Sequence, residues 1–131
     1  PSQPVAPKPE ALELPDLTGY WVVHGKIRGK DKEYELLTVL FRYAPNLYRV
    51  TCMDQTDVSL RGTARQAQGS LVIAWVDFGG GVGLGQYRVG GTHDKPVLEG
   101  EWHSSAVSQS GDIGTLAGEE KLDRIVKGKG R

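Results

Sequence analysis

The segment VGLGQYRVG, residues 82–90, decides how the rest of the chain is interpreted. Neighbouring side chains in a β-strand point to opposite faces. One face of this segment carries glycines and bulky side chains, namely Gly83, Gly85, Tyr87 and Val89. The other face carries Leu84, Gln86 and Arg88. This period of two predicts a half-buried strand that turns its glycine-rich face to a core and Arg88 to solvent.

The same alternation recurs along the chain, whereas apolar residues hardly ever recur at helical spacing. It predicts eight strands, over residues 17–25, 33–43, 47–53, 58–67, 70–78, 82–90, 97–104 and 113–126. Turns rich in Gly, Asn, Asp and Pro separate them. For residues 116–126 a short helix is an alternative, because Glu119, Glu120 and Lys121 are good helix formers.

Eight short strands can bury their apolar faces as a sandwich or as a closed barrel. Nearly every connection is short enough for a hairpin, so strands adjacent in sequence should pair. Such a meander has two open edges unless it closes. Glycines inside the predicted strands would let a strongly coiled strand bend or another backbone approach closely, and these are Gly62, Gly83, Gly85, Gly100 and Gly118. We therefore expect an all-β, eight-stranded antiparallel up-and-down β-barrel.

The composition suits one such domain. The chain has 131 residues, of which 38% are hydrophobic and 18 are glycine, so it can bury one core. Sixteen basic and sixteen acidic residues give no net charge to attract nucleic acid. No apolar run approaches the roughly 20 residues that a membrane-spanning helix needs. We expect a soluble domain that binds no nucleic acid and spans no membrane.

The single cysteine, Cys52, cannot form an internal disulfide. A small buried side chain is favoured over a reactive thiol, because no His or Lys is adjacent to lower its pKa. The chain begins with Pro1 rather than Met, which is compatible with removal of a signal peptide or with a partial chain. We favour a secreted or periplasmic location over a cytoplasmic one.

The two ends of the chain differ in composition from its middle. Five of the seven prolines fall within residues 1–15, and residues 127–131 read KGKGR. We expect residues 1–16 to form an extended Pro-rich arm or linker, residues 17–126 the barrel, and residues 127–131 a flexible basic tail.

The segment LTGYW, residues 17–21, resembles the opening of the calycin superfamily. Lipocalins carry Gly-x-Trp on their first strand, and avidins carry Leu-Thr-Gly-x-Trp. The resemblance implies an antiparallel barrel whose open mouth binds small molecules, with Gly19 and Trp21 plugging the closed end. It also implies that Arg124, on the last strand, takes the place of the arginine that stacks on the first-strand tryptophan of lipocalins.

The sequence departs from both families. Avidins follow the tryptophan with a polar strand that holds biotin, whereas Val22, Val23 and His24 follow it here, so biotin binding is not carried over. The Thr-Asp-Tyr signature of lipocalins is missing. Residues 83–89, 98–102 and 114–122 look like small uncharacterised bacterial barrel domains, to which no activity is attached.

Five residues on predicted inward faces are candidates for ligand binding, namely Tyr34, Trp75, Tyr87, Trp102 and Glu120. Glu120 shares a face with Gly118 and Leu122, which would bury its carboxylate unless Tyr34 or Arg124 pairs with it. A buried acid with a partner is either an internal clamp, which we favour, or a hook for a ligand. The tryptophans are either core residues, which we favour, or platforms for ligand stacking.

Motifs of catalysis and metal binding are missing from the sequence. His24, His93 and His103 are not spaced as a metal-binding pair, and no nucleophile elbow, zinc-protease, EF-hand or P-loop motif occurs. The run FGGGVGLG, residues 78–85, lacks the following helix that phosphate binding needs. We assign no catalytic residue, no metal and no cofactor.

Three functions stay open. We favour a non-catalytic structural or protein-interaction module, which an exposed apolar patch on a filled barrel would support. The alternative is a barrel of lipocalin or avidin type that binds a small apolar ligand, which a roomy cavity would support. The third, an isomerase or cyclase, needs Glu120 or a histidine in a cavity with a perturbed pKa. Three Trp, five Tyr and two Phe can fill much of an eight-stranded interior, which favours the interaction module.

Overall fold

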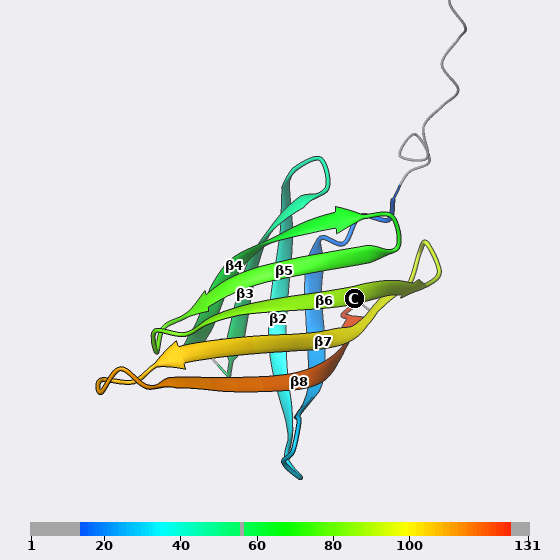
Figure 1. The fold of residues 1–131 in the computed structure, drawn as a ribbon. Coiled ribbons are helices and arrows are strands. Elements are labelled where there is room, and N and C mark those ends of the chain that lie inside the picture. The colour runs from blue at the N-terminus through cyan, green and yellow to red at the C-terminus, as the bar shows by residue number, and fades with distance from the viewer. Residues whose placement is uncertain (1–13, 56, 127–131) are drawn as a thin grey trace, which may run out of the picture.

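A computed structural model describes residues 14–55 and 57–126, which form one closed β-barrel (Figure 1). Its strands are β1 (Gly19–Ile27), β2 (Glu33–Ala44), β3 (Leu47–Asp54), β4 (Asp57–Ala67), β5 (Ser70–Asp77), β6 (Val82–Gly91), β7 (Pro96–Val107) and β8 (Ile113–Arg124). Each strand pairs antiparallel with the next, and β8 pairs with β1. This closure removes the two open edges that a meander would leave. The predicted eight-stranded up-and-down barrel is confirmed.

The last strand settles the alternative that the sequence leaves open. β8 continues as a strand to Arg124, so the short helix over residues 116–126 does not form. Because β8 pairs with β7 on one side and β1 on the other, both ladders provide partners for its backbone groups. The part of the chain that the structure describes contains no helix long and apolar enough to cross a membrane.

The Pro-rich arm and the basic tail expected from the sequence fall mostly on residues 1–13 and 127–131, which lie outside the described residues. The sequence also assigns Pro15 and Asp16 to the arm, yet both contact the barrel. Gln66 Nε2 donates to the Pro15 carbonyl at 3.0 Å, and Arg124 Nη1 donates to the Asp16 carbonyl at 2.6 Å. The barrel unit therefore includes residues ahead of Leu17.

Inward-facing side chains form one core inside the barrel. Its buried residues are Leu17, Trp21, Val23, Leu40, Tyr48, Val50, Ala64, Leu71, Ile73, Tyr87, Leu98 and Leu122. Trp102 is also buried, and Trp75 packs partly buried against the cluster. In β6 the side chain of Tyr87 is buried while that of Arg88 is exposed, as the alternation predicts. Cys52 is buried, and burial raises the pKa of its thiol, which suits an unreactive core cysteine.

The large rings of the core lie over glycines of the neighbouring strands. Trp75 is paired with Gly62 in β4 and Gly83 in β6. A Cβ atom on Gly83 would lie 2.1 Å from the Trp75 ring, and one on Gly62 would lie 2.0 Å from the Ala74 carbonyl oxygen. These close approaches explain why glycine stands at both positions.

Candidate functional site

Glu120 sits in the middle of β8, between Gly25 of β1 and Gly100 of β7. Its carboxylate accepts two short hydrogen bonds from tyrosine hydroxyls. Tyr34 Oη donates to Glu120 Oε2 at 2.6 Å, and Tyr87 Oη donates to Glu120 Oε1 at 2.6 Å. Three strands far apart in sequence thus place one acid between two phenols.

Two tryptophans extend this arrangement. Trp102 Nε1 donates to Tyr34 Oη at 2.7 Å. Trp75 meets Trp102 edge to face, with ring centroids 6.5 Å apart and planes at 64°. We call these five residues, Tyr34, Trp75, Tyr87, Trp102 and Glu120, the Glu120 cluster. Within the described residues, every buried side-chain nitrogen or oxygen has a hydrogen-bond partner.

Burial dominates the electrostatics of the cluster. Removal from water raises the pKa of Glu120, and the hydrogen bonds from Tyr34 and Tyr87 oppose that rise. Burial and the nearby Glu120 carboxylate raise the pKa of both tyrosines. The two phenols therefore remain protonated donors, and Glu120 is the group in the cluster that changes charge most readily.

Glycines make room for the cluster within the barrel wall. A Cβ atom on Gly25 would lie 2.2 Å from the Tyr34 ring. One on Gly118 would lie 2.7 Å from the Trp102 ring, and one on Gly85 would lie 2.6 Å from the Tyr87 ring. Each ring therefore lies against bare backbone, which fixes where its polar atom points.

The structure brings all five ligand-binding candidates of the sequence into this one cluster. Of the two partners considered for Glu120, Tyr34 pairs with it and Arg124 does not. Tyr87 is a partner that sequence reasoning missed, although its inward face was predicted. The register of β6, β7 and β8 would have indicated it, because Gly100 is paired with Tyr87 on one side and with Glu120 on the other.

A second group of residues, Leu17, Gly19, Trp21 and Arg124, occupies the opposite part of the interior, and we call it the Trp21 end. Trp21 is fully buried, and its Nε1 donates to the Leu17 carbonyl at 2.9 Å. The guanidinium carbon of Arg124 lies 5.5 Å from the centre of the Trp21 ring. Gly19 has φ of 147°, and a Cβ atom there would lie 3.0 Å from Arg124 Cδ. The residues expected to plug the barrel are thus in mutual contact.

Sequence reasoning also missed a polar chain beside the Trp21 end. The Leu17 backbone amide donates to Tyr48 Oη at 3.0 Å, and Tyr48 Oη donates to Gln66 Oε1 at 2.8 Å. Gln66 is 3% exposed, which is rare for this residue type. The position of Gln66 on the inward face of β4 could have indicated that its side chain is buried.

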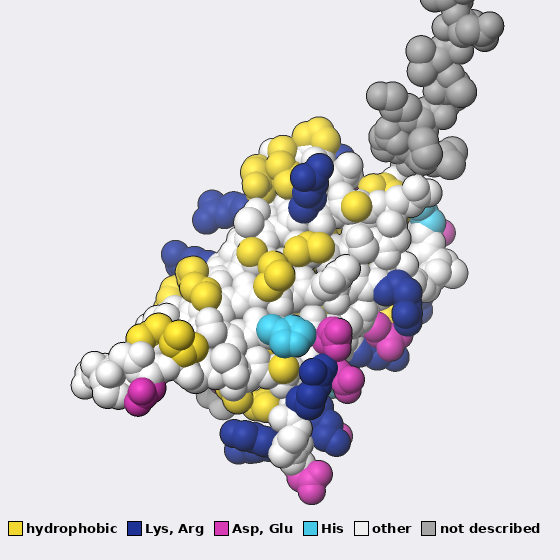
Figure 2. Space-filling view, viewed as in Figure 1, with side chains coloured by type: hydrophobic (Ala, Val, Ile, Leu, Met, Phe, Trp, Pro, Cys, Tyr) yellow, Lys and Arg dark blue, Asp and Glu magenta, His cyan; other side chains and the backbone are white. Residues whose placement is uncertain are grey.

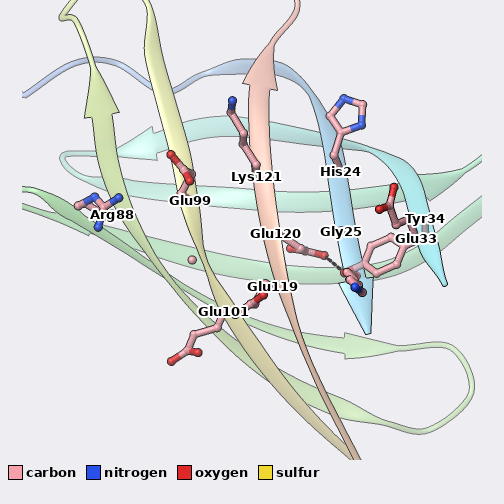
Figure 3. Close-up of a pocket in the computed structure, with 12 residues that line it drawn as sticks. His24, Gly25, Glu33, Tyr34, Arg88, Glu99, Glu101, Glu119, Glu120 and Lys121 are labelled. Carbon is pink, nitrogen blue, oxygen red and sulfur yellow. Dashed lines mark hydrogen bonds between the residues drawn. The ribbon is translucent and has the colours of Figure 1, made fainter. Parts of the chain in front are cut away.

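A hollow of about 650 Å³ adjoins the Glu120 cluster. Its lining joins Tyr34, Glu120, Gly25 and Gly100 to the outward-facing residues His24, Lys26, Glu33, Arg88, Glu99, Glu101, Glu119 and Lys121. Figure 3 shows Glu120 and Tyr34 joined by a hydrogen bond, with these charged side chains around them. Eight of its twelve lining residues point outward, so the hollow lies largely against the outer wall of the barrel.

The histidines contribute nothing to the cluster. His24, His93 and His103 are all exposed, and His24 lies 3.4 Å from Glu35 on the outer wall. Among the described residues, no group of three or more His, Cys, Asp or Glu side chains could hold a metal ion.

No family model and no curated protein matches the sequence. Among solved structures, the barrel is similar to the crystal structure of a rhizavidin–biotin complex, with a TM-score of 0.59 and 5% sequence identity. The match covers 87% of this chain and 99% of that chain. At this identity the likeness concerns the fold, and it agrees with the resemblance carried by residues 17–21. The chain therefore has the calycin-like, avidin-type fold of a closed eight-stranded antiparallel barrel.

Proposed function

We propose that this barrel is a non-catalytic binding protein for a small molecule that engages the Glu120 cluster. The observation that carries the proposal is a carboxylate held by two tyrosines and bordered by two tryptophans inside a barrel. Sites for small molecules combine aromatic walls with a few fixed polar groups, which matches this composition. The Trp21 end, in the same proposal, closes the barrel and binds nothing.

The chemistry of the cluster limits the ligand. Tyr34 and Trp75 are half-buried, so their rings offer apolar surface that a ligand can cover. Each Glu120 oxygen accepts one hydrogen bond and keeps a further lone pair for a donor. A small, mostly apolar or aromatic molecule that carries an amide, amine or hydroxyl donor fits these two features.

The structural neighbour favours ligand binding over the interaction module that the composition suggested. That neighbour is a complex with biotin. Binding is also favoured over an isomerase or cyclase, because both Glu120 oxygens are already tied to tyrosines whose raised pKa keeps them protonated. An acid held in this way positions a ligand better than it exchanges protons with one.

The test starts with native mass spectrometry of the purified protein, which detects a ligand that copurifies. A screen of small apolar amides, amines and alcohols, biotin included, then follows binding by the fluorescence of Trp75 and Trp102. We expect Glu120→Gln to weaken binding of any hit about tenfold or more, because its amide replaces one acceptor oxygen with a donor.

Glu119→Gln is the matched control, because this neighbouring acid of β8 is exposed on the outer wall. It should leave the affinity unchanged. The proposal is overturned if hits bind equally well to Glu120→Gln and the wild type, or if no compound changes the tryptophan fluorescence.

A further inference from the structure

The carboxylate of Glu120 has no basic partner in the part of the chain that the structure describes. Three ion pairs form within residues 14–55 and 57–126, and none of them includes Glu120. Arg124, a basic residue on the same face of β8, is held at the Trp21 end by the carbonyls of Asp16 and Thr18. Both Glu120 oxygens accept hydrogen bonds, which is the pattern of an ionised carboxylate. The ionised cluster therefore carries a negative charge that no neighbouring cation offsets.

The hydrogen-bond donors around this carboxylate are already used. Tyr34 and Tyr87 each donate to Glu120, and Trp102 donates to Tyr34. A phenol has one O–H and an indole one N–H, so these three side chains keep no donor for a ligand. What they still offer is the faces of their rings, which carry the negative side of the aromatic quadrupole. An anion would therefore find little to bind here.

Aromatic rings beside a carboxylate suit a positive charge. A cation over a ring face is attracted by the quadrupole of the ring, more strongly where water is partly excluded. Glu120, Tyr34 and Trp75 are each half-buried, so part of the acid and of two rings is accessible to a ligand. The accessible surface of the cluster thus combines a negative charge with aromatic rings.

From these observations we infer that the ligand of the Glu120 cluster is an organic cation, namely a small aromatic or alkyl molecule that carries a protonated amine. This inference rests on the binding role proposed above and narrows it. The ammonium N–H donates to a lone pair of Glu120 that the tyrosines leave free, and the body of the ligand lies against Tyr34 and Trp75. A charge-assisted hydrogen bond is stronger than one from a neutral amide or alcohol, and the cation offsets the cost of burying the carboxylate.

The outer surface does not account for a preference of this kind. The chain has sixteen basic and sixteen acidic residues, and Figure 2 shows side chains of both signs next to one another. On the outer wall, Glu119 is paired with Lys26, and Glu101 contacts Arg28. Salt also screens exposed charges more than a half-buried one. Selectivity for cations should therefore depend on Glu120.

Isothermal titration calorimetry with three probes of matched size tests the inference. Phenethylamine is a cation at neutral pH, phenethyl alcohol is neutral and phenylacetate is an anion. The same three groups on an indole ring provide a larger set. We expect the ammonium to bind the wild type at least about tenfold more tightly than the alcohol, and the carboxylate to bind more weakly than both.

Substitutions then identify the origin of the preference. Glu120→Gln keeps the shape of the side chain without its charge, so the ratio of ammonium to alcohol affinity should fall to about one. Glu119→Gln is the matched control, because it removes a charge from the outer wall and should keep the ratio. Trp75→Leu removes a ring face and should weaken the ammonium more than the alcohol. The wild-type ratio and Trp75→Leu carry the test if Glu120→Gln folds poorly.

An alcohol or carboxylate that binds the wild type as tightly as the ammonium overturns the inference. If Glu120→Gln abolishes that binding, the binding role of the cluster stands and only the charge assigned to its ligand is wrong. An ammonium preference that survives Glu120→Gln, or that Glu119→Gln removes, also overturns it, because outer charges would then be responsible. If no probe binds but a neutral compound of the earlier screen does, this inference fails alone. If neither set gives a hit, both proposals fail.

Discussion

Both ends of the barrel interior place a charged side chain beside tryptophan, but they satisfy that charge differently. At the Trp21 end, Arg124 donates to the backbone carbonyls of Asp16 and Thr18. In the Glu120 cluster, the carboxylate accepts from the side-chain hydroxyls of Tyr34 and Tyr87. Backbone partners are fixed by the fold, whereas side-chain partners can rotate or give way to a ligand. The partners of Arg124 are thus fixed by the fold, whereas those of Glu120 can be exchanged, which suits the binding role proposed for the cluster.

The sharpest test of this contrast is truncation of a tryptophan at each end. Trp21→Ala should destabilise the protein by about 3–5 kcal/mol, because a fully buried ring leaves a cavity and Arg124 loses its platform. Trp75→Ala should cost distinctly less, because its ring is only half-buried. Urea unfolding followed by circular dichroism measures both. Equal losses would remove the distinction between the two ends.

Removal of the Glu120 carboxylate should have the next largest effect on the free energy of unfolding. Glu120→Ala should cost about 2–3 kcal/mol, because it leaves the hydroxyls of two buried or half-buried tyrosines without an acceptor. Glu119→Ala, on the exposed side of β8, should change the free energy of unfolding by less than about 0.5 kcal/mol. A small effect of Glu120→Ala in the same unfolding assay would mean that water replaces the acid readily.

Arg124→Met should have a smaller effect, about 1–2 kcal/mol. Methionine keeps the apolar contact with Trp21 but loses the cation over the ring and the bonds to the Asp16 and Thr18 carbonyls. Thermal unfolding at low and high salt measures the change. A loss as large as that of Trp21→Ala would show that the arginine, and not the ring, holds this end together.

The dependence of stability on pH should show the smallest effect. Glu120 and Asp16, whose carbonyl accepts from Arg124 at the Trp21 end, respond to pH in opposite directions. Burial raises the folded-state pKa of Glu120 above 4.5. The stability linked to protonation of Glu120 is therefore fully present below pH 4.5 and is lost as pH rises through the folded-state pKa. The hydrogen bond from the Thr18 amide lowers the pKa of Asp16 from 3.8. The stability linked to ionisation of Asp16 is therefore present above pH 3.8 and is lost as pH falls through the folded-state pKa.

Urea midpoints across this pH range measure both effects. Glu120→Gln should flatten the decline on the alkaline side, and Asp16→Asn should flatten the decline on the acid side. The assignment is wrong if Glu120→Gln flattens the decline in stability on the acid side, or if Asp16→Asn flattens the decline on the alkaline side.

Much of the fold could be predicted from sequence because alternation is a local property. The period of two in residues 82–90 identifies the inward face of β6, and the same pattern places Glu120 inside. The partners of Glu120 could not be read in the same way. Tyr34 lies 86 residues from it and Tyr87 lies 33 residues away, so both contacts depend on the register of several strands. Likewise, the contacts of Pro15 and Asp16 need the finished barrel.

The pairing of β1 with β8 has a consequence for the connectivity of the chain. Trp21 is paired with Arg124, and the Ile125 amide donates to the Tyr20 carbonyl at 2.7 Å, so the first and last strands are neighbours in space. Every strand pairs with two neighbours around the closed barrel, so no strand is an edge strand and the chain could begin at any hairpin. A short linker from residue 126 to residue 14 would allow new termini at an exposed turn such as residues 108–112, and the permuted chain would keep every strand pair and the contacts of residues 15–17.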